Sequence, residues 1–407
     1  MPNFLRLPSL SLARPLVVVA GLFLASCGGG GGGDDAPAPP PTSSGLQSSA
    51  SLANMCTLET EKKFVRSYLD EIYLWWNEIP SVNAASYPTV ASYFNALLVR
   101  TPDATGQPKD RFSAVLTSAG ANALQAAALP IVAPSTAPVP LAKVVTSPAG
   151  RKVGYVLFND HDQGAQDALI AAFEGVRDAA VQDLVLDMRY NAGGFLYAAR
   201  TAASMVAGPQ SEGRVFEQVR FNSKRQAETA ASTYLFSSRL QTAESRFPSG
   251  YALPQLNLPR LYVLSSGLTC SASESIVNSL RGIDVQVILV GETTCGKPYG
   301  FRRKDNCGLA FFPIEFQGFN AKDFGDYQNG FAPTCAVADD FNSVLGAADE
   351  PLLAAALKHA DTGSCPAASA TAPSQALLSD NLALPARAHA PATLRAPWEG
   401  KLLRQGS

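Results

Sequence analysis

The sequence predicts an α/β protein with a mostly parallel sheet, preceded by a small helical unit. Strand and helix patterns alternate from about residue 151 to residue 365, as in sheets whose parallel strands are joined by helical crossovers. The run Asp183–Met188 is largely apolar, which is typical of a strand buried on both faces. Residues 56–79 instead repeat apolar side chains every three or four positions, which predicts an amphipathic helix.

Composition and charge narrow the class of protein. The chain has 407 residues, of which 46% are hydrophobic and 16% charged, so it can form one large domain or two ordinary ones with a sizeable core. Its net charge is -2 and it contains no basic run. Because nucleic-acid binding needs a positive surface, we expect no nucleic-acid partner.

The predicted helical unit spans residues 51–100. Its first helix starts near Thr57, has acidic residues in its first turn and ends before Pro80. A second helix is predicted over Thr89–Val99. Residues 101–150 follow, and because much of this segment is rich in alanine and proline without clean periodicity, we expect a linker there.

The alternating region, residues 151–365, supplies the predicted core. Strands are predicted over Val153–Phe158, Asp183–Met188, Val215–Phe221, Pro259–Ser265, Val285–Val290 and Cys307–Phe316. Helices are predicted over Gln166–Arg177, Tyr197–Val206, Ser273–Leu280 and Pro351–Lys358. Residues 366–407 return to an Ala/Pro/Ser bias and are expected to be a disordered tail.

The first 27 residues are expected to be an export signal rather than part of the fold. Arg6 and Arg14 precede the apolar run Leu16–Leu24, which is too short to span a bilayer. The run ends in Leu-Ala-Ser-Cys, which is similar to a bacterial lipobox, so Cys27 is the expected lipidation site; an ordinary secretory signal is the alternative. We therefore expect an envelope lipoprotein that faces the periplasm, anchored in the outer membrane.

A flexible tether is expected after the export signal, and the cysteines of an exported protein are expected to form disulfides. Residues 28–50 are Gly-, Pro- and Ser-rich and are expected to be disordered. Without Cys27 an even number of cysteines remains, which in an exported protein suggests disulfides, with fifteen pairings left open. These six are Cys56, Cys270, Cys295, Cys307, Cys335 and Cys365.

No metal or other cofactor is expected. The sequence has no CxxC motif, and its histidines are His161, His359 and His389. Cys270 has no histidine nearby in sequence to activate it, so a cysteine nucleophile is disfavoured.

A serine-rich turn is the first candidate site. Thr269–Glu274 reads Thr-Cys-Ser-Ala-Ser-Glu and joins a predicted strand to a predicted helix. Ser271 is therefore expected at a helix N-terminus, where free N–H groups favour negative charge. The N–H of Ala272 could then bind an oxyanion. Serines that only cap a helix are the structural alternative.

Lys297 gives the serine a possible proton acceptor. It follows the strand Val285–Val290, and a helix plus a strand can bring it back beside Ser271. A lysine base must be neutral near pH 7, so its pKa must fall several units from about 10.4. The apolar neighbours Pro298, Tyr299 and Phe301 favour such a shift. A surface loop lysine is the alternative.

A glycine loop completes the candidate site. The strand Leu184–Asp187 leads into Asn191-Ala192-Gly193-Gly194, where glycine lets the backbone approach a substrate closely. Gly193 is the expected second oxyanion donor, with Gly194 as the alternative. An ordinary loop between strand and helix would also carry glycine.

At these three places the chain resembles the S41 serine peptidases, the C-terminal processing or tail-specific protease family. The matching segments are Leu184–Gly194, Thr269–Glu274 and Gly291–Lys297. The resemblance implies a crotonase/ClpP-like α/β spiral core and makes Ser271, rather than Ser273, the nucleophile. The segment Cys56–Pro80 also resembles the N-terminal part of S41 lipoproteins.

Two features depart from the family. Many members carry a glutamine four residues after the lysine to orient it, and Phe301 stands there in this chain. Members usually carry a PDZ domain before the core, but residues 101–150 are too few for one, so we expect it to be absent or a remnant. Capture of a substrate tail by PDZ strand addition would then be missing.

We therefore expect an exported serine endopeptidase that cleaves unfolded or extended proteins with a Ser271/Lys297 dyad. Its partners would be a peptide or protein substrate and a membrane, reached through the lipid anchor. The alternative is a non-catalytic protein that binds a peptide or apolar ligand on a peptidase scaffold. The substrate, cleavage specificity and oligomeric state stay open.

Overall fold

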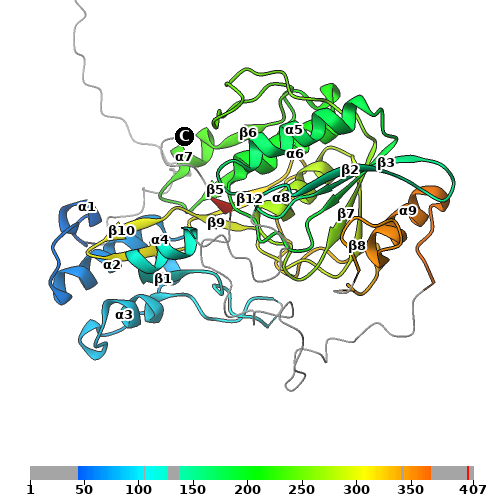
Figure 1. Cartoon of the computed structure of the whole chain (residues 1–407). Coiled ribbons are helices and arrows are strands. Elements are labelled where there is room, and N and C mark those ends of the chain that lie inside the picture. Colours follow the sequence, from blue (N-terminus) through cyan, green and yellow to red (C-terminus); the bar gives the residue numbers. More distant parts are fainter. Residues whose placement is uncertain (1–44, 105, 127–136, 341–342, 368–400, 403–407) are drawn as a thin grey trace, which may run out of the picture. The chain divides into compact units, whose positions relative to one another are not determined.

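The main sheet has six strands in the order β13-β8-β7-β4-β3-β2 (Figure 1). The computed structural model describes residues 45–104, 106–126, 137–340, 343–367 and 401–402. Five strands of the sheet are parallel, and β2 pairs antiparallel with β3 at one edge. The strands are β2 Leu141–Thr146, β3 Lys152–Leu157, β4 Asp183–Asp187, β7 Arg260–Ser265, β8 Gln286–Gly291 and β13 Cys335–Ala336.

Helices cover both faces of this sheet. Because successive side chains of a strand point to opposite faces, Leu184 and Leu186 of β4 join one buried cluster while Val185 joins another. The first cluster includes residues of α5 Ala165–Asp178, α6 Leu196–Ala207 and α8 Ala272–Gly282. The second includes residues of α9 Pro351–Thr362, so this helix covers the opposite face. The predicted α/β class is confirmed.

The small helical region packs on a sheet of its own. That sheet has the order β1-β11-β10 and is antiparallel. Phe64 of α2 and Phe94 of α3 both contact Phe311 of β11, and a disulfide joins Cys56 to Cys307. The elements are α1 Ser49–Leu52, α2 Leu58–Ile72, α3 Val90–Leu97, β1 Ala114–Thr117, β10 Lys304–Asn306 and β11 Leu309–Phe312.

A third sheet has the order β14-β9-β12-β5-β6. Its pairs are antiparallel except β14 with β9, which is parallel. The strands are β5 Val215–Phe221, β6 Thr233–Leu235, β9 Tyr299–Phe301, β12 Phe316–Phe319 and β14 Lys401–Leu402. The remaining elements are α4 Ser118–Ala126, α7 Gln226–Ala231 and the 3₁₀ helices η1 Trp76–Glu78, η2 Ala84–Ser86 and η3 Pro209–Ser211.

Two differences from the sequence expectations concern residues 101–150 and the strand expected over Cys307–Phe316. Residues 101–150, expected to be a linker or PDZ remnant, contribute β1, α4 and β2, and the two strands pair with β11 and β3. Their partners lie far away in sequence, so composition alone does not reveal the pairing. The strand expected over Cys307–Phe316 is divided into β11 and β12, because Pro313 lacks an N–H donor.

Other expectations fall mainly outside the described residues. These are the export signal, Cys27, most of the tether, and residues 368–400 and 403–407 of the expected disordered tail. Within that tail, Lys401–Leu402 form β14. In the part of the chain that the structure describes, no helix is long and apolar enough to cross a membrane.

Candidate active site

Three neighbouring parallel strands bring the three sequence motifs together. The strands β8, β7 and β4 are adjacent in the main sheet. The glycine loop follows β4, the serine turn follows β7, and Lys297 follows β8. Since the carboxyl ends of parallel strands lie at one edge of a sheet, all three loops leave from the same edge.

Ser271 occupies a strained backbone position at the start of α8. Its φ of 58° and ψ of −109° lie outside the regions that non-glycine residues normally adopt, which costs about 1–3 kcal/mol. The side chain is fully buried. Strain of this kind persists only where the surroundings hold it, and it occurs often at active sites.

The serines of this turn have different hydrogen-bond roles. Ser273 Oγ donates to the carbonyl of Asn191 at 3.0 Å, and Ser275 Oγ donates to the carbonyl of Ser271 at 3.3 Å. Ser271 Oγ has no hydrogen-bond partner within the described residues. Ser273 and Ser275 therefore bond within the fold, whereas the buried hydroxyl of Ser271 makes no such bond to the described residues.

The Lys297 loop is fastened to the serine turn. Cys270 and Cys295 form a disulfide, and the N–H of Cys295 donates to the carbonyl of Thr269 at 3.0 Å. The side chain of Lys297 is only 4% exposed. Its Nζ lies 4.9 Å from the ring centre of Phe301 and 5.3 Å from that of Phe112. Phe301 thus contacts the lysine through an aromatic face.

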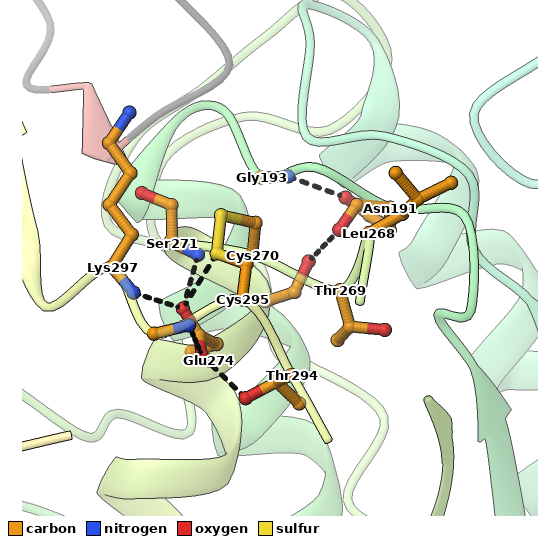
Figure 2. The surroundings of a disulfide bond; sticks show 12 residues. Asn191, Gly193, Leu268, Thr269, Cys270, Ser271, Glu274, Thr294, Cys295 and Lys297 are labelled. Atoms are coloured by element: carbon orange, nitrogen blue, oxygen red, sulfur yellow. Dashed lines mark hydrogen bonds between the residues drawn. A yellow bond between two sulfur atoms is a disulfide. The ribbon is translucent and has the colours of Figure 1, made fainter. Parts of the chain in front are cut away.

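One carboxylate, Glu274, holds the two predicted catalytic residues together (Figure 2). Its Oε2 accepts the N–H of Ser271 at 2.9 Å and the N–H of Lys297 at 2.8 Å. The two nitrogens therefore cannot be further apart than the sum of these distances. Figure 2 also shows the Ser271 hydroxyl turned to the side along which the Lys297 side chain runs.

Glu274 is fully buried and four donors satisfy it. Besides the two N–H groups, its Oε1 accepts Thr294 Oγ1 at 2.6 Å and the N–H of Gly296 at 2.8 Å. Burial raises the pKa of Glu274 above its usual value, and these hydrogen bonds oppose the rise. The sequence analysis gave this residue no role. The sequence feature that could have revealed Glu274 is a charged side chain in the first turn of the helix, where the neighbouring residues are uncharged.

Gly193 brings the glycine loop against the serine turn. Its φ is +103°, and a Cβ there would lie 2.9 Å from the carbonyl oxygen of Cys270 and 3.0 Å from both Ser271 Cβ and Ala272 N. A side chain at this position would therefore collide with the serine turn. The N–H of Cys270 also donates to the carbonyl of Asn191 at 3.1 Å, which fixes the distance between the two loops.

The predicted oxyanion donors are placed differently from one another. The N–H of Gly193 donates to Asn191 Oδ1 at 3.0 Å, so it is engaged in this structure. The N–H groups of Ala272 and of the alternative Gly194 have no acceptor among the residues described. Ala272 N lies at the start of α8, where the helix dipole adds to its positive character.

A buried histidine supports the glycine loop and was not assigned a role from sequence. His161 Nδ1 lies 3.0 Å from Asn191 Oδ1, while Asn191 Nδ2 donates to the carbonyl of Phe158 at 3.0 Å. With the amide so oriented, the histidine must donate from Nδ1. Burial lowers the pKa of His161 to about 3, so the ring is neutral. His161 follows β3, the strand beside β4, which is the positional signal that could have found it.

A buried ion-pair network surrounds Arg189, which lies between β4 and the glycine loop. Arg189 is fully buried and binds Asp187 at 3.0 Å, Asp339 at 2.6 Å and Glu350 at 2.8 Å. Burial disfavours the charged guanidinium, but the three carboxylates outweigh it and raise the pKa of Arg189. Glu350 also caps α9 by accepting the N–H groups of its first turn. The network therefore fixes the end of β4 relative to the start of α9.

Comparisons with known proteins identify the family of the chain. The sequence model of peptidase family S41 matches residues 152–333, and that of the peptidase S41 N-terminal domain matches residues 60–114. Together they cover more than half of the chain. No curated protein matches the sequence.

Solved structures share the fold at low sequence identity. A presumed S41 protease from Bacteroides fragilis NCTC 9343 is 19% identical, with a TM-score of 0.60 over 74% of this chain and 97% of that one. A photosystem II D1 C-terminal processing protease is 20% identical, with a TM-score of 0.39 over 54% of this chain and 55% of that one. A lipoprotein from Streptococcus agalactiae is 10% identical, with a TM-score of 0.46 over 69% and 92%. The last two scores are too low to support an inference. Because the matched segments include the serine turn, the lysine loop, the glycine loop and most of the helical unit, the chain belongs to peptidase family S41.

Proposed function

We propose that the protein is a serine endopeptidase that uses Ser271 as nucleophile and Lys297 as general base. The observation that carries the proposal is the buried Ser271 hydroxyl, which has no partner in the described residues although its backbone shares the Glu274 carboxylate with Lys297. A structural serine at a helix start would use its hydroxyl as a cap, and the neighbouring Ser273 and Ser275 each donate to a backbone carbonyl.

The chemistry follows the order of a serine hydrolase. Ser271 Oγ attacks the scissile carbonyl carbon while its proton passes to Lys297 Nζ. The N–H of Ala272 holds the oxygen of the tetrahedral intermediate, and the N–H of Gly193 joins it by exchanging its bond to Asn191. When the C–N bond breaks, the lysine ammonium protonates the leaving amine. Water then attacks the acyl-enzyme and restores the hydroxyl of Ser271.

Lys297 must be uncharged when it accepts the proton. Its 4% exposure and the surrounding phenyl rings of Phe112 and Phe301 keep water away, and exclusion from water favours a neutral amine. In a desolvated site the ring faces attract the ammonium form by about 2 kcal/mol or more, while burial of a charge costs several kcal/mol. We propose that the amine is neutral before the reaction and that the rings stabilise its ammonium form after it has taken the proton.

We also propose that the protein is an exported lipoprotein of the bacterial envelope, anchored through Cys27. Three disulfides, Cys56–Cys307, Cys270–Cys295 and Cys335–Cys365, support export, because such bonds persist in oxidising compartments. Labelling with a radioactive or clickable fatty acid tests the anchor. Label retained after Cys27→Ala would contradict it.

The catalytic proposal is tested with protein lacking residues 1–27 on casein and on an unstructured fluorescent peptide. Ser271→Ala and Lys297→Met should each lower kcat/KM at least about a thousandfold, because each removes half of the proton-transfer pair. Ser279→Ala is the matched control, since Ser279 is another fully buried serine of α8 whose hydroxyl lacks a partner in the described residues. Equal activity in Ser271→Ala and the unaltered protein would overturn the assignment.

The second candidate is a non-catalytic peptide-binding protein on the same scaffold. It is favoured by the engaged N–H of Gly193 and by Phe301 in place of an orienting glutamine. A serine-directed phosphonate probe separates the two functions. Covalent labelling of Ser271 supports the peptidase, whereas peptide binding without labelling supports the scaffold.

A further inference from the structure

The strand β9 begins two residues after Lys297. One of its two edges is already paired within its sheet. On that edge it pairs with β12, where the N–H of Glu315 donates to the carbonyl of Gly300 at 2.9 Å and the N–H of Gly318 donates to that of Pro298 at 3.0 Å. Main-chain groups alternate sides along a strand, so those of Tyr299 and Phe301 face the other edge. The strand also runs beside the candidate base, because the ring of Phe301 in β9 is 4.9 Å from Lys297 Nζ.

A distant part of the chain lies on this second edge. Lys401–Leu402 form β14, which pairs parallel with β9, with Lys401 opposite Gly300 and Leu402 opposite Phe301. Figure 1 shows this short strand in red beside β9. In this register the main chain of Lys401 meets Tyr299 and Phe301, while the N–H of Leu402 points away from β9. Without β14, β9 would be an open edge strand, which is a template for another extended chain.

We propose that this edge of β9 binds extended polypeptide by parallel strand addition, and that residues 401–402 of the protein itself occupy it when substrate is absent. The competition with substrate rests on the proposed peptidase function; the binding of a strand does not. Recognition through main-chain hydrogen bonds is tolerant of side chains, which suits a peptidase of loose specificity.

The pairing fixes the direction of a bound peptide. Because β14 and β9 are parallel, an extended polypeptide added at this edge runs in the same direction as β9, from Tyr299 to Phe301.

Peptide binding is measured first, because it does not depend on catalysis. The acceptor is a Ser271→Ala variant without residues 401–407, and the probe is a fluorescein-labelled peptide with the sequence of residues 396–407. Fluorescence anisotropy should show binding that falls at least tenfold when the backbone nitrogen of Lys401 is methylated. Methylation at Leu402 is the matched control and should have little effect. Failure to bind, or equal loss with both modified peptides, overturns the proposal.

Activity and amide exchange supply the second test in the intact chain. Lys401→Pro removes the N–H that faces β9 and should lower KM for an unstructured peptide at least threefold with kcat unchanged, whereas Leu402→Pro should not. Exchange of the Phe301 amide with deuterium should accelerate in Lys401→Pro alone. Peptide binding with no activity in any variant would refute the peptidase function but not the strand site. Activity with unchanged KM and unchanged Phe301 exchange would refute the strand site but not the peptidase.

Discussion

Ser271 illustrates how the backbone sets the surroundings of one side chain. Its φ of 58° lies outside the regions that non-glycine residues normally adopt, and Gly193 can approach it closely only because Gly193 lacks a Cβ. The strained conformation costs about 1–3 kcal/mol, which is comparable to the hydrogen bonds that hold it. Chief among these is the bond from the Ser271 N–H to Glu274.

Glu274→Gln should lower kcat at least tenfold while KM changes little. The amide nitrogen would face N–H donors in place of an acceptor, so Ser271 and Lys297 would lose their common anchor although neither is altered. We also expect a loss of about 2 kcal/mol in the free energy of unfolding. Steady-state kinetics and urea titration measure both effects. Glu292→Gln, an exposed carboxylate in the same loop, should change neither, and an unchanged kcat in Glu274→Gln would disprove the positioning role.

The low pKa of His161 predicts that the free energy of unfolding depends on pH. Its pKa is about 3 in the fold against an ordinary 6.5, so below pH 6.5 the unfolded chain binds a proton that the folded protein does not. Stability from this residue is complete above pH 6.5 and is lost toward pH 3, by up to about 1.4 kcal/mol per pH unit. Burial raises the pKa of Asp162 from its ordinary 3.8 to about 6. Between these two pH values the folded protein binds a proton that the unfolded chain has lost, so the contribution of Asp162 to stability increases on acidification.

The contribution of His161 to this pH dependence is measured by comparing variants. The free energy of unfolding of His161→Gln should fall less steeply on acidification between pH 6.5 and 3 than that of the unaltered protein. His359→Gln is the control, since that histidine is only half-buried and should change the slope less. Identical slopes for His161→Gln and the unaltered protein would show that His161 is not neutral in the fold.

At the scale of elements, the disulfide Cys270–Cys295 links the turn before α8 to the loop after β8. It spans 25 residues, and a loop of this size gives a stabilisation of about 3.5 kcal/mol in the chain-entropy model. Replacing both cysteines with alanine should cost that amount and also lower kcat at least tenfold, because the Lys297 loop would move relative to Ser271.

The bond Cys335–Cys365 provides a matched control for this prediction. It spans 30 residues, nearly the same loop length, but its cysteines belong to β13 and the segment after α9. Its removal should cost similar stability and leave kcat unchanged. Thermal unfolding and peptide hydrolysis measured on the two double variants decide the point. An equal effect of both variants on kcat would show that the first disulfide has no special role at the site.

At the scale of the whole molecule, the Arg189 network joins elements from different parts of the chain. Arg189→Met should destabilise the protein by about 3–5 kcal/mol, because it leaves Asp187, Asp339 and Glu350 buried without their cation. Arg151→Met is the control. Arg151 binds the buried Asp183, but Asp183 keeps a second partner in Arg260, so the loss should stay near 1 kcal/mol. Urea unfolding that showed equal losses would exclude a special role for the network.

Much of the core could be predicted because its elements carry their own patterns. The predicted strand Asp183–Met188 is β4, Asp183–Asp187, and the predicted helix Pro351–Lys358 is the first part of α9. Long apolar runs and helical periodicity are local properties. The short strands β9, β10 and β14 were not predicted, because strands of two or three residues are defined by the partners they pair with, which lie far away in sequence.

The sequence alone determined the α/β class, the order of the core elements and the types of residue that the three motifs offer. Those properties follow from periodicity and from spacing along the chain. Tertiary structure decided which groups meet: that Glu274 bonds the N–H groups of both Ser271 and Lys297, that Asn191 engages Gly193, and which cysteines pair. These contacts depend on adjacent strand ends and on the direction of individual donors, which no local pattern of residues encodes.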